Sequence, residues 1–159
     1  MTLKRKAGHR RWGARGGKVP GKHRGDIMTS EKRSQVMAKI RGKNTTPELL
    51  IEQHLFARRL RFERHPGDLP GRPDFVFRDQ RVVVFVDGDF WHGYRFSLWA
   101  HKLSPKWRQK IALNRLRDTR NFAKLRRRGW KVIRIWEHQI ERDAALCADK
   151  IMLAVKYRK

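Results

Sequence analysis

Apolar residues in the first half of the chain recur with the spacing of helices. Residues 29–44 are typical of a short capped helix. Residues 45–60 predict a clearer helix, in which Thr46 is the cap and Pro47 takes the first helical position. The apolar face predicted for this second helix consists of Leu50, Ile51, Leu55 and Phe56.

Short β-branched and aromatic runs in the middle of the chain predict a sheet. Residues 61–65 are a short strand candidate. Residues 74–78 and 81–88 predict two strands joined by a tight turn at 79–80, and the second has the continuous apolar character of a buried strand. Residues 130–136 predict a further strand.

Two more helices are expected in the second half of the chain. Residues 104–129 predict a long basic helix that ends at Gly129, and residues 141–157 predict a closing amphipathic helix. Strands and helices therefore alternate along the chain. We expect an α/β fold with a mixed central sheet of about four strands, flanked by helices.

The net charge of the chain indicates that its partners are polyanions. Its 159 residues include 40 Lys and Arg against 15 Asp and Glu, a formal net charge of +25. A field of that sign attracts nucleic acid, and a merely basic, ribosome-like protein is the alternative. Residues 1–27 are rich in Lys, Arg and Gly without apolar periodicity, so we expect a disordered basic arm before a domain at 28–159.

Cysteine usage and hydropathy predict an intracellular protein. Cys147 is the only cysteine, so neither a disulfide framework nor a cysteine-based zinc site can form. No run of about 18 apolar residues exists, and the N-terminus lacks the apolar segment of a secretory signal. We expect an intracellular, reducing location.

Three carboxylates could form a metal site. Asp74 begins one predicted strand and Asp87 ends the next, so a hairpin brings them to one edge of the sheet, where Glu48 could join them. Clustered acids on a basic protein oppose DNA binding unless a divalent cation lies between them and the phosphate, and Mg²⁺ prefers such ligands. Alternatively, the two aspartates form turns and Glu48 favours its helix N-terminus.

The segment VDGDFWHG, residues 86–93, adds a histidine and two aromatic rings beside these acids. His92 could accept a proton from an attacking water, although a lone histidine is often structural. Phe90 and Trp91 could belong to the core, or they could act as a wedge that unstacks bases.

Five blocks between residues 28 and 142 resemble the very-short-patch-repair (Vsr) mismatch endonucleases. The blocks are RSQVMAKIRGKNTTPE, LPGRPDFVF, VVFVDGDFWHG, KWRQKIALNRLRDTRN and GWKVIRIWEHQI. The resemblance implies the PD-(D/E)xK restriction-endonuclease-like fold and Mg²⁺-dependent nicking of duplex DNA beside a T:G mismatch, the lesion left when 5-methylcytosine deaminates. It also implies a monomer in a bacterial-type cytoplasm, associated with the nucleoid, with mismatch-repair proteins as candidate partners.

Roles in the metal site follow from the resemblance, motif by motif. Asp74 matches the principal carboxylate that binds Mg²⁺, as one or two ions, and Val86 matches a residue whose backbone carbonyl is a ligand. His92 matches the histidine that activates water, and Glu48 matches a glutamate that supports the site.

The resemblance also implies the contacts to DNA. Met37, Phe90 and Trp91 match the residues that wedge next to the mismatch. Lys110 and Asn114 match positions on the long helix that face the recognised bases.

The chain departs from the family pattern in two places. Asp87 replaces a histidine, which makes it a candidate catalytic residue and a direct metal ligand. The better-known members also hold a structural zinc through three cysteines and a histidine. The matching positions here are Asp89, Tyr94, Phe96 and His138. We therefore expect no structural zinc, and we expect that region to be held by the packing of Trp99, Trp107 and Trp136.

The sequence thus predicts a Mg²⁺-dependent DNA endonuclease in which water attacks the phosphate without a covalent protein intermediate. Lys and Arg of the 104–128 helix would neutralise the DNA backbone. One rival is a restriction-like or mobile-element nuclease on the same fold with another specificity. A second rival is a non-catalytic DNA-binding protein.

Overall fold

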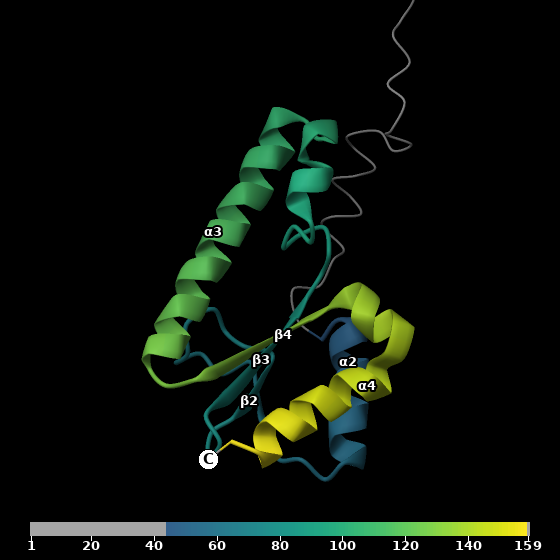
Figure 1. Ribbon diagram of the computed structural model, residues 1–159, viewed down its shortest axis with the longest axis vertical. Coiled ribbons are helices and arrows are strands. Elements are labelled where there is room, and N and C mark those ends of the chain that lie inside the picture. Colours follow the sequence, from purple (N-terminus) through teal and green to yellow (C-terminus); the bar gives the residue numbers. More distant parts are fainter. Residues whose placement is uncertain (1–43, 159) are drawn as a thin grey trace, which may run out of the picture.

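The computed structural model describes residues 44–158, shown as ribbon in Figure 1. The elements in chain order are α2 (Thr46–Ala57), β1 (Glu63–Arg64), β2 (Phe75–Phe77), β3 (Val82–Asp87), the 3-10 helices η1 (Phe96–Leu98) and η2 (Ala100–Lys102), α3 (Pro105–Arg127), β4 (Lys131–Trp136) and α4 (Glu137–Lys156). The basic arm expected at 1–27, the helix predicted at 29–44 and Met37 lie outside the described residues.

The strands form one mixed sheet in the order β1-β2-β3-β4. The β1–β2 and β2–β3 pairs are antiparallel, and the β3–β4 pair is parallel. A parallel pair needs a long crossover connection, which here contains η1, η2 and α3. The expected α/β class with a mixed sheet of four strands is confirmed.

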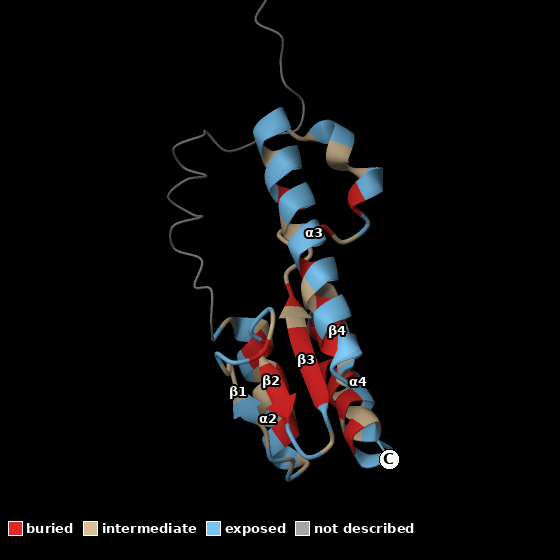
Figure 2. Cartoon of the chain, turned by 90° about the vertical axis from the view of Figure 1, so that its left-hand side faces the viewer, coloured by how far each residue is buried: buried red, intermediate tan, exposed pale blue. Residues whose placement is uncertain are grey.

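Both faces of the sheet are covered, and β3 supplies side chains to each in alternation. Val82 and Val84 belong to a core with α2 and α4, whereas Val83 and Phe85 pack with residues of α3. Figure 1 places α3 on one side of the sheet and α2 with α4 on the other. Figure 2 shows β3 as a strand of buried residues, which explains its continuous apolar sequence.

Helix α2 begins with a different cap from the one predicted. Thr45, not Thr46, is the N-cap, and its backbone is extended. The Thr45 hydroxyl donates to Glu48 Oε1 at 2.8 Å instead of capping a backbone amide. Phe56 is 61% exposed, so the buried face of α2 is narrower than predicted and rests on Ile51 and Leu55.

Helix α4 begins earlier than the predicted residue 141. It starts at Glu137, directly after β4, because the Gln139 side chain accepts a hydrogen bond from the Trp136 backbone amide at 3.1 Å. A kink at Asp143, with φ −163° and ψ 88°, separates this first part from the predicted amphipathic part. No helix in residues 44–158 is long and apolar enough to cross a membrane.

Candidate active site

The β2–β3 hairpin brings Asp74 next to Val86. Asp74 immediately precedes β2, and its backbone amide donates to the Val84 carbonyl at 2.9 Å. The Val86 amide in turn donates to Asp74 Oδ2 at 2.6 Å. The carboxylate is therefore held against the backbone at the end of β3, where the sequence predicted the two segments to meet.

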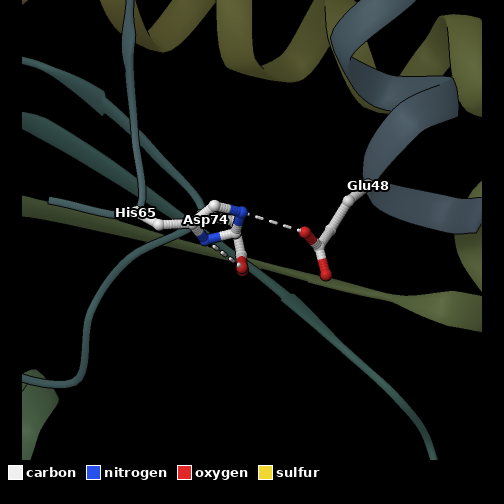
Figure 3. A group of neighbouring side chains, drawn as sticks. All are labelled: Glu48, His65 and Asp74. Atoms are coloured by element: carbon white, nitrogen blue, oxygen red, sulfur yellow. Dashed lines mark ion pairs between the residues drawn. The ribbon is translucent and has the colours of Figure 1, made fainter. Parts of the chain in front are cut away.

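Glu48 and Asp74 both contact one histidine, which the sequence analysis did not select. His65 Nε2 lies 3.2 Å from Glu48 Oε2, and His65 Nδ1 lies 3.5 Å from Asp74 Oδ1 (Figure 3). The pairing of Arg64 with Phe75 places the next residue, His65, beside Asp74. Pairing the strand candidate at 61–65 with the Asp74 strand would have identified it.

The three side chains form a donor set suited to a divalent cation. One ligand atom each from Glu48, His65 and Asp74 lies within 4.8 Å of the other two. Glu48 is buried. Its Oε2 accepts a hydrogen bond from the Asn44 backbone amide at 2.9 Å, and Thr45 contacts its other oxygen, so the carboxylate is oriented from both sides. Two carboxylates and an imidazole are ordinary ligands of divalent metals, so the cluster fits a metal site.

The electrostatics of Asp74 favour a cation nearby. Burial raises the pKa of Asp74 to about 7, and the charges of Glu48 and Asp87 act in the same direction. The hydrogen bond from Val86 and the charge of His92 oppose this rise. A carboxylate with this pKa is ionised only in part at neutral pH, and a bound cation would favour the ionised form.

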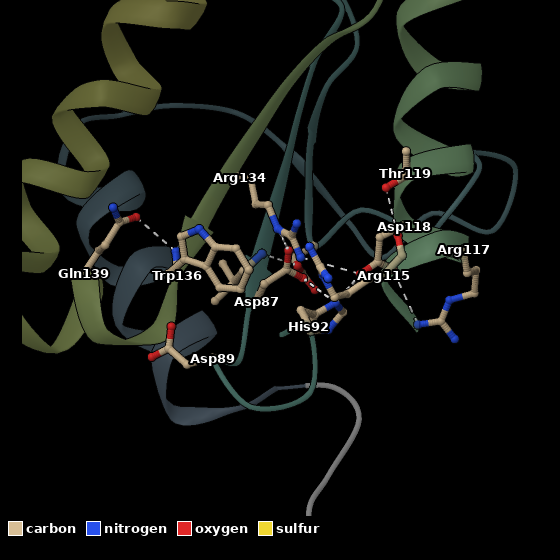
Figure 4. A network of polar contacts seen from close by, with 12 residues as sticks. Asp87, Asp89, His92, Arg115, Arg117, Asp118, Thr119, Arg134, Trp136 and Gln139 are labelled. Carbon is tan, nitrogen blue, oxygen red and sulfur yellow. Dashed lines mark hydrogen bonds and ion pairs between the residues drawn. The ribbon is translucent and has the colours of Figure 1, made fainter. Parts of the chain in front are cut away.

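A second network lies at the end of β3 and joins α3 to β4 (Figure 4). Asp87 and Asp118 are both buried, and each contacts the same histidine and arginine. Asp87 Oδ1 lies 3.3 Å from His92 Nδ1, and Asp87 Oδ2 accepts a hydrogen bond from Arg134 Nε. Asp118 Oδ2 lies 2.6 Å from His92 Nδ1 and 3.5 Å from Arg134 Nη2. Two acids and two basic groups thus form a closed ring.

Asp118 is the second residue of this site that the sequence analysis missed. Burial raises the pKa of Asp118, but its hydrogen bond to His92 and the charges of His92 and two arginines together outweigh burial and lower this pKa overall. Burial raises the pKa of Asp87 despite the charges of His92 and Arg134. The sequence feature that could have identified Asp118 is that it is the only acid in α3, among many Lys and Arg.

Both clusters face one cleft of about 470 Å³. Its lining includes Asp74 and His92, and the cations Arg72 and Arg117 border the same space. Gly71, with φ +80°, lets the loop before β2 approach α3, because a Cβ there would lie 3.2 Å from Phe85 Cε1 and Asn121 Cβ. The cleft therefore combines acids, a histidine and cationic walls.

Phe90 and Trp91 form a surface cluster of aromatic rings outside the two cores. Phe90 stacks on Trp99 with ring centroids 5.6 Å apart, and Trp91 meets Trp107 at the same separation. Lys110 Nζ lies 5.2 Å from the ring centroids of both Trp91 and Trp107. Phe90 remains 36% exposed, so its ring is available to a ligand.

The loop that carries these rings is attached to α3 at two points. The Asn114 side-chain amide donates to the Trp91 carbonyl at 3.2 Å. Gly93 has φ +65°, and a Cβ there would lie 2.7 Å from Arg115 Cδ. Only glycine allows this approach without displacement, so the loop and α3 hold His92 between them.

The four positions that the sequence resemblance assigned to zinc ligands lie in contact with other side chains. Asp89 Oδ1 lies 2.6 Å from His138 Nδ1. The Tyr94 ring lies 4.4 Å from the His138 ring and 5.0 Å from the Trp136 ring. Phe96 packs edge-on against Trp99 at 5.2 Å, and Trp107 packs instead on Phe90 and Trp91.

A mixed sheet with acids and a histidine at the end of β3, on a chain of net charge +25, defines an enzyme that acts on nucleic acid. The family model for the DNA mismatch endonuclease Vsr matches residues 25–98. The chain is 34% identical over 134 residues to the type II nicking enzyme V.NmeDIP of Neisseria meningitidis serogroup C, covering 82% of this chain and 90% of that protein.

Two other relatives agree with this match. Identity is 39% over 123 residues with the type II nicking enzyme V.XorIIP of Xanthomonas oryzae pv. oryzae, covering 76% of this chain and 90% of that protein. Identity is 36% over 115 residues with the DNA mismatch endonuclease Vsr of Escherichia coli, covering 70% of this chain and 73% of that protein. The chain belongs to the Vsr endonuclease family, as its sequence blocks predicted, and it is a DNA endonuclease.

Proposed function

We propose that this endonuclease requires Mg²⁺ and nicks one strand of duplex DNA next to a T:G mismatch. The observation that carries the proposal is the single cleft in which Asp74 and His92 lie together, within a member of the Vsr family. Mismatch specificity is supported by the Escherichia coli relative, a DNA mismatch endonuclease, and by the exposed aromatic ring of Phe90.

Asp74 would hold the metal together with the backbone carbonyl of Val86, and Glu48 and His65 would support it. The Val86 amide already anchors one carboxylate oxygen of Asp74, while Glu48 and His65 place their ligand atoms close by. When bound, Mg²⁺ would neutralise phosphate charge and make a water molecule more acidic.

His92 would accept the proton of the attacking water. Its Nδ1 is held 2.6 Å from Asp118, and an imidazole that donates from Nδ1 keeps Nε2 free to accept a proton. His92 lines the cleft, so its ring borders the space in which substrate would lie. Asp118 acts through His92 and is a positioning residue.

DNA would be held by the cationic and aromatic surfaces around the cleft. Arg72 and Arg117 border the cleft and would contact phosphates. Phe90 and Trp91 would insert beside the mismatch, with Lys110 next to their rings. Asn114, which lines a second groove of about 440 Å³ on α3, would present its carbonyl oxygen to a base edge.

No structural zinc would be needed in this scheme. The Asp89–His138 pair and the Tyr94 ring connect the loop to the start of α4, where zinc would otherwise connect them. The endonuclease would act as a monomer near the bacterial chromosome, with mismatch-repair proteins as partners.

The test uses two labelled duplexes that differ only in one T:G or T:A pair. With Mg²⁺, we expect one nick confined to the mismatched duplex and none in EDTA. Equal cutting of both duplexes would favour a restriction-like nuclease, a candidate supported by relatives that are named type II nicking enzymes. Binding without cutting under any divalent metal would contradict the catalytic proposal.

A further inference from the structure

Two large apolar side chains of α3 are exposed to solvent. Leu113 is 58% exposed and Leu116 is 47% exposed. The residues of α3 that are buried are Ile111, Asp118, Phe122 and Leu125. Figure 1 shows the first half of α3 extending beyond the sheet, and Figure 2 shows most of the helix surface exposed. The two leucines therefore lie on a side of α3 that neither hydrophobic core covers.

The groove of about 440 Å³ on α3 is lined by these leucines and adjoins the catalytic cleft. Arg117 and Asn121 line both the groove and the cleft, so the two hollows share a wall. Leu113 and Leu116 are three residues apart, and residues at this spacing lie on the same face of a helix. A duplex whose phosphate lies in the cleft therefore passes over the leucines.

The groove combines apolar side chains with positive charge. Arg117, Arg120 and Lys124 line it, all three are exposed, and its described lining contains no acid. The cations suit DNA phosphates. A leucine has neither a charge nor a hydrogen-bonding group, so it can contact only an apolar part of the duplex.

The major groove of DNA offers one such apolar group. It is wide enough to admit an α-helix, and thymine presents its C5-methyl group there. 5-Methylcytosine carries a methyl group at the same ring position. Two exposed leucines between cations on a protruding helix therefore match a methylated pyrimidine that lies between phosphates.

We propose that Leu113 and Leu116 contact the C5-methyl group of a pyrimidine in a base pair that flanks the mismatch. The inference rests on the proposed function and adds to it the recognition of bases around the T:G pair. Asn114 lines the same groove and donates to the Trp91 carbonyl, so the groove lies next to the rings assigned to the mismatch itself. The leucines determine which sequence context binds, and they take no part in the chemical step.

The test compares duplexes that differ by one methyl group. T:G duplexes with varied flanking base pairs are sorted by their affinity for the wild-type protein, without divalent metal so that no strand is cut. Each flanking thymine of the tightest duplex is then replaced by uracil, which lacks only the C5-methyl group. At the position that meets the leucines, uracil should weaken binding about fourfold, the effect of one buried methyl group.

A second pair of duplexes distinguishes the two sources of the methyl group. It carries 5-methylcytosine or cytosine, each paired with guanine, at the position that responds to uracil. A similar fourfold difference shows that the groove accepts either methylated base, and no difference restricts the contact to thymine.

Variants assign the methyl contact to the leucines. The double variant Leu113→Ala/Leu116→Ala should bind the thymine and uracil duplexes equally, whereas Leu116→Met, which keeps an apolar side chain, should retain the difference. Leu153→Ala is the matched control, because Leu153 is 48% exposed on α4, on the other side of the sheet, and it should also retain the difference. A double variant that still distinguishes thymine from uracil would overturn the inference, as would a wild type that does not.

Nicking of T:G and T:A duplexes in Mg²⁺ is measured separately. A wild type that nicks beside T:G but binds thymine and uracil duplexes equally would refute only the methyl contact. A wild type that distinguishes thymine from uracil but does not nick beside T:G would refute the proposed function and leave the methyl contact in place.

Discussion

At the scale of single residues, two aspartates of the site differ in the groups that are packed around them. Asp74 is partly buried beside a histidine and a backbone amide, whereas Asp87 is buried beside an arginine. Desolvation raises the pKa of Asp74 to about 7, so that this carboxylate has most to gain from a metal ion. The environment of Asp87 supplies its own cation. Identical side chains therefore acquire different roles from the groups packed around them.

The raised pKa of Asp74 predicts how stability depends on pH without metal. Its folded pKa lies above the unfolded value of 3.8, so the folded state binds more protons between about pH 4 and 7. The free energy of unfolding should therefore fall as pH rises through that window. At pH 8, metal-free Asp74→Asn should be more stable than wild type by about 2–4 kcal/mol.

Urea denaturation at pH 5 and pH 8, with and without Mg²⁺, measures this effect. The stability that Asp74→Asn gains over wild type should be smaller at pH 5. At pH 8, Mg²⁺ should offset this gain because it stabilises the wild type. A variant that is equally stable to wild type at pH 8, or less stable, would show that burial of this carboxylate carries no such cost.

Asp118→Asn tests the positioning of His92. An amide cannot stabilise an imidazolium as a carboxylate does, so nicking should fall by about 100-fold, and the pH at which activity rises should change. Single-turnover nicking of the T:G duplex across pH 5.5–9 measures both. Arg117→Gln is the control for lost charge beside Asp118, and it should weaken DNA binding without changing the shape of the pH profile. An unchanged profile for Asp118→Asn would remove Asp118 from the mechanism.

At the scale of elements, the sheet pairing determines which residues meet. The strand at 81–88 and the helix at 104–129 could be predicted from apolar spacing, and the hairpin predicted that Asp74 meets the end of β3. His65 could not be assigned without the β1–β2 pairing, because it follows a strand of only two residues. Asp118 required knowledge of which face of α3 packs on the sheet. Local patterns predicted the elements, but contacts between distant elements completed the site.

The loop between β3 and α3 depends on a glycine at its closest approach to the helix. Gly93→Ala should cost about 1–3 kcal/mol, because a non-glycine residue at φ +65° is strained and its Cβ would contact Arg115. Since His92 precedes this residue, nicking should fall more than stability explains. Thermal denaturation and single-turnover nicking measure the two effects.

Gly67→Ala is the matched control for this change. A Cβ at Gly67 meets no atom within 4 Å, so both stability and nicking should stay close to wild type. If Gly93→Ala also left nicking unchanged, the close approach of the loop to α3 would not matter for catalysis.

At the scale of the whole molecule, a strongly basic chain places three acids, Asp74, Asp87 and Asp118, in one cleft. Arginines border that cleft, and the aromatic cluster lies at the N-terminal part of α3, away from the two hydrophobic cores. Charge and the aromatic loop could be predicted from the sequence alone. The ring of Asp87, Arg134, Asp118 and His92 could not, because its members come from three separate elements and the loop after β3.

The aromatic cluster should distinguish mismatched from paired DNA. Trp91→Ala should weaken binding to a T:G duplex by about 10-fold or more, and it should change binding to the paired duplex much less, because stacking matters only where bases separate. Fluorescence anisotropy with both duplexes measures the difference. Leu98→Ala, on the same loop and 65% exposed, should leave both affinities unchanged. Equal losses on both duplexes would assign Trp91 to general backbone contact.

The central claim is that Asp74 carries metal-dependent nicking, and one measurement tests it most directly. Single-turnover nicking of the T:G duplex is compared between wild type and Asp74→Asn in Mg²⁺, with duplex affinity measured on the same samples. We predict that the variant loses about three orders of magnitude in rate while its affinity stays within about threefold of wild type. Nicking by Asp74→Asn at the wild-type rate, or nicking by the wild type in EDTA, would contradict the account.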